Sequence, residues 1–330
     1  MNKPRLIAIS LVALVLAPGT WLRDPPLAEG HADVRLVPLA VEQPADWPAS
    51  LTLEAAWELE SGHPALGGIS AMIWRDGGTS FHLFSDKGQT AVIPVPDRVF
   101  RRGLAAQVTA PIHKLPREDQ LSQVPDIESA VVDPDSGTLW LGYENYNAIR
   151  RLAPDGRSQV ILPQQWQHLP RNSGIEAMAR FADGRFVMLA ERSGEGFLFA
   201  RDPLAGEPAQ EFRFEPPGEF NPTAMALLPD GRAVILLRAL RRTLPPFASM
   251  LVIADPAEIR AGEAWPYTVL AQWDDAGLRE NYEGMAIAPD GDGFAAIWLI
   301  SDDNLSILQR SLLLKLRFEY AAHRQTARAG

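Results

Sequence analysis

The chain contains no cysteine, which excludes disulfide bonds, thiolate metal sites, a cysteine nucleophile and lipid attachment through cysteine. Histidine is scarce too, and its six residues show no spacing typical of metal ligands. Acidic side chains outnumber basic ones, so the formal net charge is −10. This charge argues against nucleic acid as a partner, because phosphates require a basic surface. The sequence also lacks a phosphate-cradling glycine loop, a dinucleotide fingerprint and a Gly-x-Ser-x-Gly elbow.

An uncharged apolar stretch near the N-terminus, residues 6–17, follows Lys3 and Arg5 and is interrupted by Pro18 and Gly19. At about 12 residues it is shorter than the ~20 that a membrane-spanning helix needs. Residues 1–28 are therefore expected to be a signal peptide, cleaved near Ala28 or Ala32, with retention as an anchor as the alternative. A cysteine-free exported protein is typical of the periplasm, so we expect a periplasmic or secreted protein with no transmembrane span after cleavage.

One short phrase recurs five times along the chain. Its copies are Ile69-Ser70-Ala71-Met72, Ile127-Glu128-Ser129-Ala130, Ile175-Glu176-Ala177-Met178, Pro222-Thr223-Ala224-Met225 and Tyr282-Glu283-Gly284-Met285. The second residues of these phrases are 58, 48, 47 and 60 positions apart. This spacing is typical of propeller blades rather than of helical repeats.

Each copy is followed by an apolar run, a turn and a second apolar run. Several of the turns contain Asp-Gly, such as Asp183-Gly184, which is a strong hairpin signal because the turn needs a positive φ. The acids of these turns are interpreted as turn formers on the opposite rim. The sequence therefore predicts an all-β chain that forms a single β-propeller over residues 51–320. Five repeats are visible, and the length left over between residues 98 and 123 favours six blades.

The two ends of the chain are expected to differ from the repeats. Residues 29–50 are rich in proline and are predicted to be an irregular leader, and residues 321–330 a flexible tail. The first strand, over residues 51–59, and the last, over residues 315–320, are expected to meet in one blade, which would remove an exposed sheet edge.

Equal hairpin arms would place polar residues side by side at the open end of each hairpin. Counted from the turn at Asp183-Gly184, Glu176 and Glu191 are almost equally far along the two strands and are expected to lie opposite each other. Opposed residues lie about 5 Å apart, so each pair should be in contact. The other pairs are Ser70 with Asp86, Glu128 with Glu144, Thr223 with Arg238, and Glu283 with the stretch 301–304. All of these side chains are expected to gather on one rim.

Acids gathered on one rim repel each other when ionised. Bound cations, raised pKa values or interleaved basic residues could relieve this repulsion. Oxygen ligands without cysteine or histidine select hard ions such as calcium or magnesium. The candidate metal ligands are Asp86, Glu128, Glu144, Glu176, Glu191, Glu283, Asp302 and Asp303. Basic residues near the strand ends, which could bind a phosphate, are Lys87, Arg150, Arg151, Arg192 and Arg238. Alternatively, the acids only tie blades together by accepting backbone N–H bonds.

Several stretches resemble the phytase-like family, described as esterase-like activity of phytase. The stretches are 126–128, 144–151, 172–179, 190–192, 281–286, 300–304 and Gln309. The resemblance implies a β-propeller, export, and phosphoric-ester hydrolysis on phytate-like substrates with calcium. The matching acids are Asp126, Glu128, Glu176, Glu191, Glu283, Asp302 and Asp303, with Asn172 and Asn304 as polar companions. The sequence departs from the family pattern at Ser129 and at Ala177, where the family usually has glycine. It also departs in the fourth repeat, which has Leu237-Arg238 where a Glu-Arg pair is common.

These observations lead to the hypothesis of an exported, metal-assisted phosphoric-ester hydrolase. Calcium would be held by Glu128, Glu176, Glu191, Glu283 and Asp302, and a metal-bound water would attack. Glu176, Glu191, Arg238, Lys87 and Arg150 are the candidate catalytic residues, with the cations gripping phosphate. A monomer acting on a small phosphorylated or sugar-like ligand is expected. A non-catalytic binding propeller and a calcium-dependent lactonase or esterase stay open as alternatives.

Overall fold

The computed structural model describes residues 29–75, 77–99, 104–116, 126–170, 174–306 and 308–323. The expected signal peptide, residues 1–28, lies outside the described residues, as does the expected tail from residue 324 onward. Within the described ranges, no helix combines the length and apolar character needed to cross a membrane.

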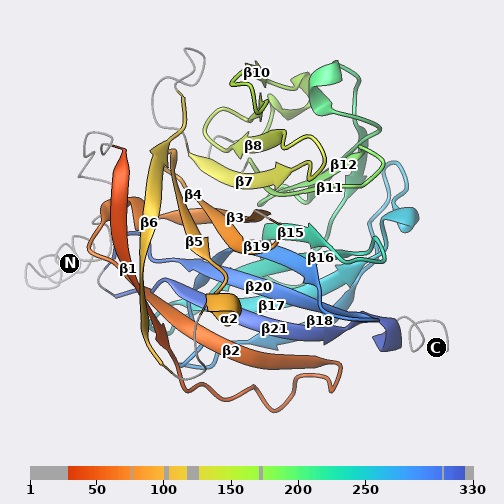
Figure 1. Cartoon of the computed structure of the whole chain (residues 1–330). Helices are drawn as coiled ribbons and strands as arrows, with labels where there is room; N and C mark the ends of the chain where they lie inside the picture. The colour runs from red at the N-terminus through yellow and green to blue at the C-terminus, as the bar shows by residue number, and fades with distance from the viewer. Residues whose placement is uncertain are drawn as a thin grey trace, which may run out of the picture.

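The described strands form five antiparallel units of four strands around a central axis (Figure 1). Blade 1 contains β3 (Ile69–Arg75), β4 (Ser80–Ser85), β5 (Gln89–Pro94) and β6 (Ala106–Lys114). Blade 2 contains β7 (Ile127–Val132), β8 (Leu139–Tyr143), β9 (Ala148–Leu152) and β10 (Ser158–Ile161). Blade 3 contains β11 (Ile175–Arg180), β12 (Phe186–Ala190), β13 (Glu195–Phe199) and β14 (Gln210–Arg213). Blade 4 contains β15 (Asn221–Leu227), β16 (Ala233–Leu240), β17 (Phe247–Ala254) and β18 (Thr268–Trp273). Blade 5 contains β19 (Asn281–Pro289), β20 (Phe294–Asp302), β21 (Leu312–Glu319) and β2 (Leu51–Glu60).

The blades close into a ring through their first strands. Strand β3 packs against β7, β7 against β11, β11 against β15, β15 against β19, and β19 returns to β3. In blade 5 the early strand β2 pairs with the last strand, β21, as predicted for the two ends of the chain. The helical pieces are short and lie in connections: η2 (Pro64–Leu66), α2 (Pro96–Val99), η4 (Gln164–Trp166), η5 (Pro203–Ala205) and η6 (Pro256–Glu258). The sequence prediction of an all-β propeller is therefore confirmed.

The expected sixth blade is not found among the described strands, which form five. Part of the leftover length, residues 106–114, forms β6, the outer strand of blade 1. The segment expected to be an irregular leader also contains a strand, β1 (Gly30–Pro38). Strand β1 pairs with both β2 and β6 and joins blades 5 and 1 into one nine-stranded sheet (Figure 1). Its side chains alternate, with Ala32, Val34 and Leu36 buried, as in a strand with one face on a core.

Aromatic side chains fill the space between blades 5 and 1. Trp298 of β20 is only 1% exposed and stacks on Trp57 of β2, with ring centroids 5.7 Å apart. Phe81 of β4 meets Trp298 edge-on at 5.1 Å. Large aromatic rings bury much apolar surface and prefer such stacked and edge-on contacts. This packing holds the two blades together on either side of the ring's closure point.

Every first strand carries a β-bulge at the same place. In blade 1, Ile69 pairs with Ser85 and Ala71 pairs with Phe84, so that Ser70 is an extra residue in the ladder. The equivalent extra residues in the other blades are Glu128, Glu176, Thr223 and Glu283. A bulge bends its strand and re-aims a side chain. The second residue of each repeated phrase is therefore the residue that the bulge sets apart.

Candidate metal centre

The bulge residues line the axial channel of the propeller. Ser70, Glu128, Glu176 and Glu283 border the channel, whereas the hydroxyl of Thr223 donates to the carbonyl of Tyr282 at 3.0 Å. The channel is also bordered by the methionines of the repeated phrases, Met72, Met178, Met225 and Met285, which are buried as predicted. The bulges thus direct three glutamates to the axis from blades that lie far apart in the sequence.

A second set of polar residues lies where the second strand of each blade ends. Its members are Asp86, Glu144, Glu191, Arg238 and Asp302. The expected pairing of Glu176 with Glu191 is wrong, because the backbone N–H of Glu191 donates to the carbonyl of Gly174 at 3.0 Å. The same shift places Glu144 opposite Asp126, Asp86 opposite Gly68, Arg238 opposite Asn221, and Asp302 opposite Asn281. The bulge causes the shift, since it adds one residue to the first arm of every hairpin.

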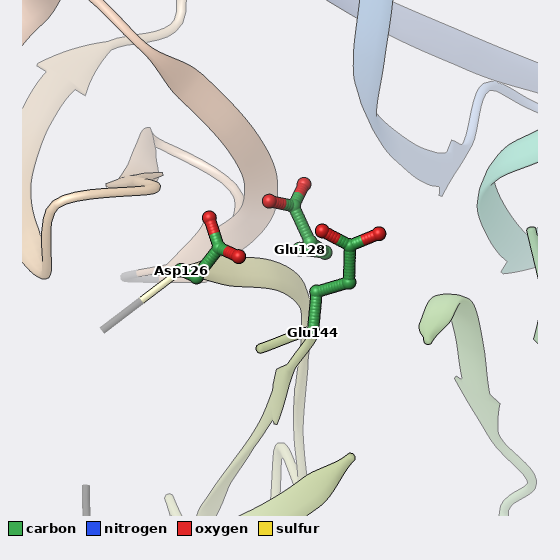
Figure 2. A group of neighbouring side chains, drawn as sticks. All are labelled: Asp126, Glu128 and Glu144. Carbon is green, nitrogen blue, oxygen red and sulfur yellow. The ribbon is translucent and has the colours of Figure 1, made fainter. Parts of the chain in front are cut away.

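Despite the changed register, the carboxylates of blades 2 and 3 do come together. Asp126, Glu128 and Glu144 each offer an oxygen within 4.8 Å of the others, and Figure 2 shows their carboxyl groups around a common space. Glu144, Glu176 and Glu191 form a second such group. Glu144 belongs to both groups, so the five acids make one continuous cluster, here called the acidic cluster. Asp126 belongs to the acids that the family resemblance had singled out.

The acidic cluster is costly in its ionised form. Burial, with the charges of Asp126 and Glu191 adding to its effect, raises the pKa of Glu144 to about 8. Burial also raises the pKa values of Glu128 and Glu176 well above their usual range, with neighbouring glutamates adding to the effect. On the blade 1 side, burial raises the pKa of Asp86 to about 7. Unscreened carboxylates in a poorly hydrated site favour protonation or a cation.

Arg238 is a largely buried basic residue in contact with the acidic cluster. Its guanidinium donates to Asn281 at 2.5 Å, to Glu283, and to Glu191 Oε1 at 3.2 Å. Arg192, which is exposed, forms an ion pair with the other oxygen of Glu191, with Nε 2.8 Å from Oε2. Lys87 lies beside Asp86, where its charge lowers the pKa of that carboxyl group. Arg238 and Arg192 therefore neutralise part of the negative charge of Glu191 and Glu283.

Arg150 was expected to grip phosphate, and the structure places it elsewhere. It lies on β9, is 2% exposed, and donates from Nε to Ser158 at 2.9 Å and from Nη1 to the Tyr143 hydroxyl at 3.5 Å. Its neighbour Arg151 forms an ion pair with Asp202 at 2.5 Å. The third strand of a blade lies away from the axis, so both arginines stabilise the blade rather than the mouth of the channel.

The acids that follow β20 act mainly on the backbone. Asp303 Oδ1 accepts from the N–H groups of Leu305 at 2.9 Å and Gly68 at 3.2 Å, which ties blade 5 to blade 1. Asp302 Oδ1 accepts from the N–H of Asn304 at 2.7 Å. Asp303 therefore ties two blades together, as the alternative interpretation expected, whereas the bond of Asp302 stays within its own loop. Of the predicted metal ligands, Asp86, Glu283, Asp302 and Asp303 lie outside the acidic cluster. Asn172 lies outside the described residues.

Asn147 adds a neutral oxygen next to the acidic cluster. Its Nδ2 donates to the carbonyl of Leu169 at 3.0 Å, while its buried Oδ1 has no hydrogen-bond partner among the described residues. Gly174 leaves room beside it, because a Cβ at that position would lie 2.9 Å from Asn147 Oδ1 and 3.1 Å from Glu144 Cγ. The sequence reasoning missed Asn147, although an asparagine in a tight turn, here with φ 47°, is a signal for a special position.

These residues fit a hard cation such as calcium. The donors are carboxylate and amide oxygens, which are the ligands that calcium prefers. A cation would relieve the repulsion that raises the pKa of Glu144 and would give Asn147 Oδ1 a partner. The chain's own residues therefore provide negative charge and closely spaced oxygen atoms that would suit a cation between blades 2 and 3.

Solved structures that resemble this chain have low sequence identity to it. A streptogramin B lyase is 11% identical, with a TM-score of 0.41, and the match covers 81% of this chain and 98% of the lyase. A virginiamycin B lyase from Staphylococcus aureus is 11% identical, with a TM-score of 0.43 and coverage of 86% and 99%. A luciferin-regenerating enzyme is 9% identical, with a TM-score of 0.46 and coverage of 76% and 92%. No curated protein matches the chain.

The sequence matches a family model over most of the described chain. The model is that of the phytase-like family, described as esterase-like activity of phytase, and the match covers residues 64–305. It includes the five repeated phrases and the acidic cluster. The chain therefore belongs to the phytase-like family.

Proposed function

We propose that this protein is an exported, calcium-dependent hydrolase that cleaves phosphate esters as a monomer. Membership of the phytase-like family supports a hydrolase. The observation that carries the proposal is the acidic cluster, in which Glu144 joins two groups of carboxylates whose oxygens lie within 4.8 Å. Export is proposed from the charged and apolar pattern of the N-terminal residues.

Within this proposal, Asp126, Glu128, Glu144 and Glu176 would hold the ion, with Asn147 Oδ1 as a neutral donor. A calcium ion held there would supply charge neutralisation for a phosphate ester and would lower the pKa of a water molecule. Glu191 would not ligate the ion, since its two oxygens form ion pairs with Arg192 and Arg238.

Other residues of the mouth would handle the substrate. Lys87 and Arg192 are the basic residues proposed to bind phosphate. The Arg192 side chain is 63% exposed although it pairs with Glu191, whereas Arg150 and Arg238 are largely buried and donate to protein groups. Asp86, with its pKa raised to about 7, can hold a proton near neutral pH and give it to the leaving alcohol. Each step then uses a group at the same end of the channel.

The proposal is tested first by calcium binding and then by turnover. Calcium that binds the folded state must raise the melting temperature by mass action, so we expect a dose-dependent increase at millimolar calcium. Hydrolysis of phytate and of p-nitrophenyl phosphate should require calcium. Glu144→Gln should abolish both effects, whereas Asp183→Asn, an exposed acid on a distant turn, should preserve them. No shift of the melting temperature with calcium would contradict the proposal.

A second candidate is a calcium-dependent lactonase or carboxylic esterase acting on a neutral substrate. It is favoured by the engagement of Arg150 and Arg238, which leaves few cations for a phosphate. The double variant Lys87→Gln/Arg192→Gln separates the two candidates. A phosphatase should lose substrate affinity in this variant, whereas a lactonase should keep it. If neither phosphate esters nor lactones are hydrolysed, the protein is a non-catalytic binding propeller.

A further inference from the structure

Arg238 occupies a position that carries an acid in every other blade. The equivalent residues at the end of the second strand are Asp86, Glu144, Glu191 and Asp302. Blade 4 alone contributes a positive charge to this ring of five equivalent positions. Because blade 4 carries arginine where the other blades carry an acid, a guanidinium lies among the carboxylates at this position.

The guanidinium lies between carboxylates from two different blades. It donates from Nη2 to Glu191 of blade 3 and from Nη1 to Glu283 of blade 5. The Arg238 side chain is 17% exposed, and those of Glu191 and Glu283 are 4% and 13% exposed. Arginine stays protonated at any relevant pH and presents donors in a rigid fork. Arg238 therefore bridges two acids in the way that a divalent ion would.

With Arg238 between blades 3 and 5, the acids on blades 2 and 3 are the ones left to bind an ion. Oε1 of Glu191 pairs with Arg238 and Oε2 pairs with Arg192, so both oxygens already lie against cations. The remaining acids of the acidic cluster, Asp126, Glu128, Glu144 and Glu176, lie on blades 2 and 3. The unpartnered, buried Oδ1 of Asn147 lies on the same side, beside Glu144.

We infer that Arg238 is a built-in cation that takes the place of a second metal ion, so that the channel mouth binds one divalent ion, on the side of blades 2 and 3. The inference rests on the metal site of the proposed function and fixes its stoichiometry. It also changes the expected role of Arg238, which positions Glu191 and Glu283 instead of gripping phosphate.

The number of calcium ions bound tests this inference, and isothermal titration calorimetry of the full chain counts them directly. The wild-type protein should bind one ion. Arg238→Gln frees Glu191 and Glu283 and should bind a second ion, whereas Arg238→Lys keeps the charge and should bind one. Two ions in the wild-type protein, or one ion with unchanged affinity in Arg238→Gln, would overturn the inference.

Arg238→Gln alone could fail to fold, since removing one partner of a buried ion pair is strongly destabilising. A second variant therefore serves as a control. Arg238→Gln/Glu283→Gln removes one charge of each sign, and it should fold and bind a single ion as the wild type does. Two ions in this double variant would show that the second site needs only the loss of the arginine and would overturn the bridging role of Glu283. The outcomes also separate the two proposals. A wild-type protein that binds no calcium overturns the proposed metal site itself, whereas one that binds two ions leaves that site standing and overturns only the role of Arg238.

Discussion

The backbone N–H of Glu144 donates to the carbonyl of Asp126 at 3.0 Å, and this pairing sets their two carboxyl groups side by side. Asp126 has a positive φ of 49°, an uncommon conformation for a residue other than glycine. Their proximity is unfavourable while both are ionised. The contact therefore links the stability of the fold to protonation and to cation binding.

The calcium-free protein should lose stability as the pH rises. The pKa of Glu144 is about 8 in the folded state and about 4.5 when unfolded, so the folded state binds more protons between these values. Stability then falls across this range, by up to about 1.4 kcal/mol per pH unit for one group. Melting temperatures measured in EDTA between pH 5 and 8 check this slope. Glu144→Gln should flatten it, and an unchanged slope would contradict the assignment.

Calcium should reverse this trend. Carboxylates bind calcium when ionised, so protons compete with the ion. The increase in melting temperature that calcium causes should be larger at pH 8 than at pH 5. A larger increase at pH 5 would mean that the ion binds outside the acidic cluster.

Gly174→Ala should weaken calcium binding with little change in fold. The added Cβ would lie 2.9 Å from Asn147 Oδ1 and 3.1 Å from Glu144 Cγ, so both groups must shift. We expect affinity to fall by about 10- to 100-fold, as when the surroundings of metal ligands are altered. Gly30→Ala is the matched control, because a Cβ there has nothing within 4 Å. Calorimetric titration compares the two, and equal affinities would argue against a site at Gly174.

Substitutions of Arg150 and Lys87 should have different effects: the first should lower stability, and the second should weaken substrate binding. Arg150→Gln should lower the free energy of unfolding by about 1–3 kcal/mol, because it removes the hydrogen bonds that Arg150 donates to the half-buried Ser158 hydroxyl and to the buried Tyr143 hydroxyl. Its KM should stay close to that of the wild type. Lys87→Gln should raise KM for a phosphate ester and leave the melting temperature nearly unchanged. The reverse pattern would place the phosphate site on blade 2 instead.

Strand β1 should matter for stability although it precedes the repeats. Leu36 is 1% exposed and packs in the core between blades 5 and 1, so Leu36→Ala should cost about 2–5 kcal/mol. The neighbouring Arg35 forms only an exposed ion pair with Glu60, and Arg35→Ala should cost less than about 1 kcal/mol. Denaturant unfolding of both variants measures the difference. Equal costs would show that β1 does not contribute to the folded core.

The repeated phrases and their turns allowed the propeller and the closing pair of β2 and β21 to be predicted, because these signals are local and periodic. The register could not be predicted, since a bulge adds a residue such as Glu176 without any signal in composition. The position of Arg150 was missed because equal hairpin arms say nothing about the third strand. Strand β1 could have been found, because Ala32, Val34 and Leu36 alternate with polar residues. The local turn in which Asn147 N–H donates to the Glu144 carbonyl places Asn147 beside Glu144, but the approach of Gly174 to both residues is tertiary and no pattern encodes it.

The pairing of β2 with β21 has a consequence for the order of folding. Leu51 lies opposite Phe318, so almost the whole chain must be available before the ring can close. Contacts of such large sequence separation form slowly. Until residues 312–319 arrive, β2 lacks β21, its partner within the fifth blade, and the molecule stays an open arc with exposed strand edges. A chain cut short before Leu312 should therefore accumulate as aggregate instead of as a smaller propeller.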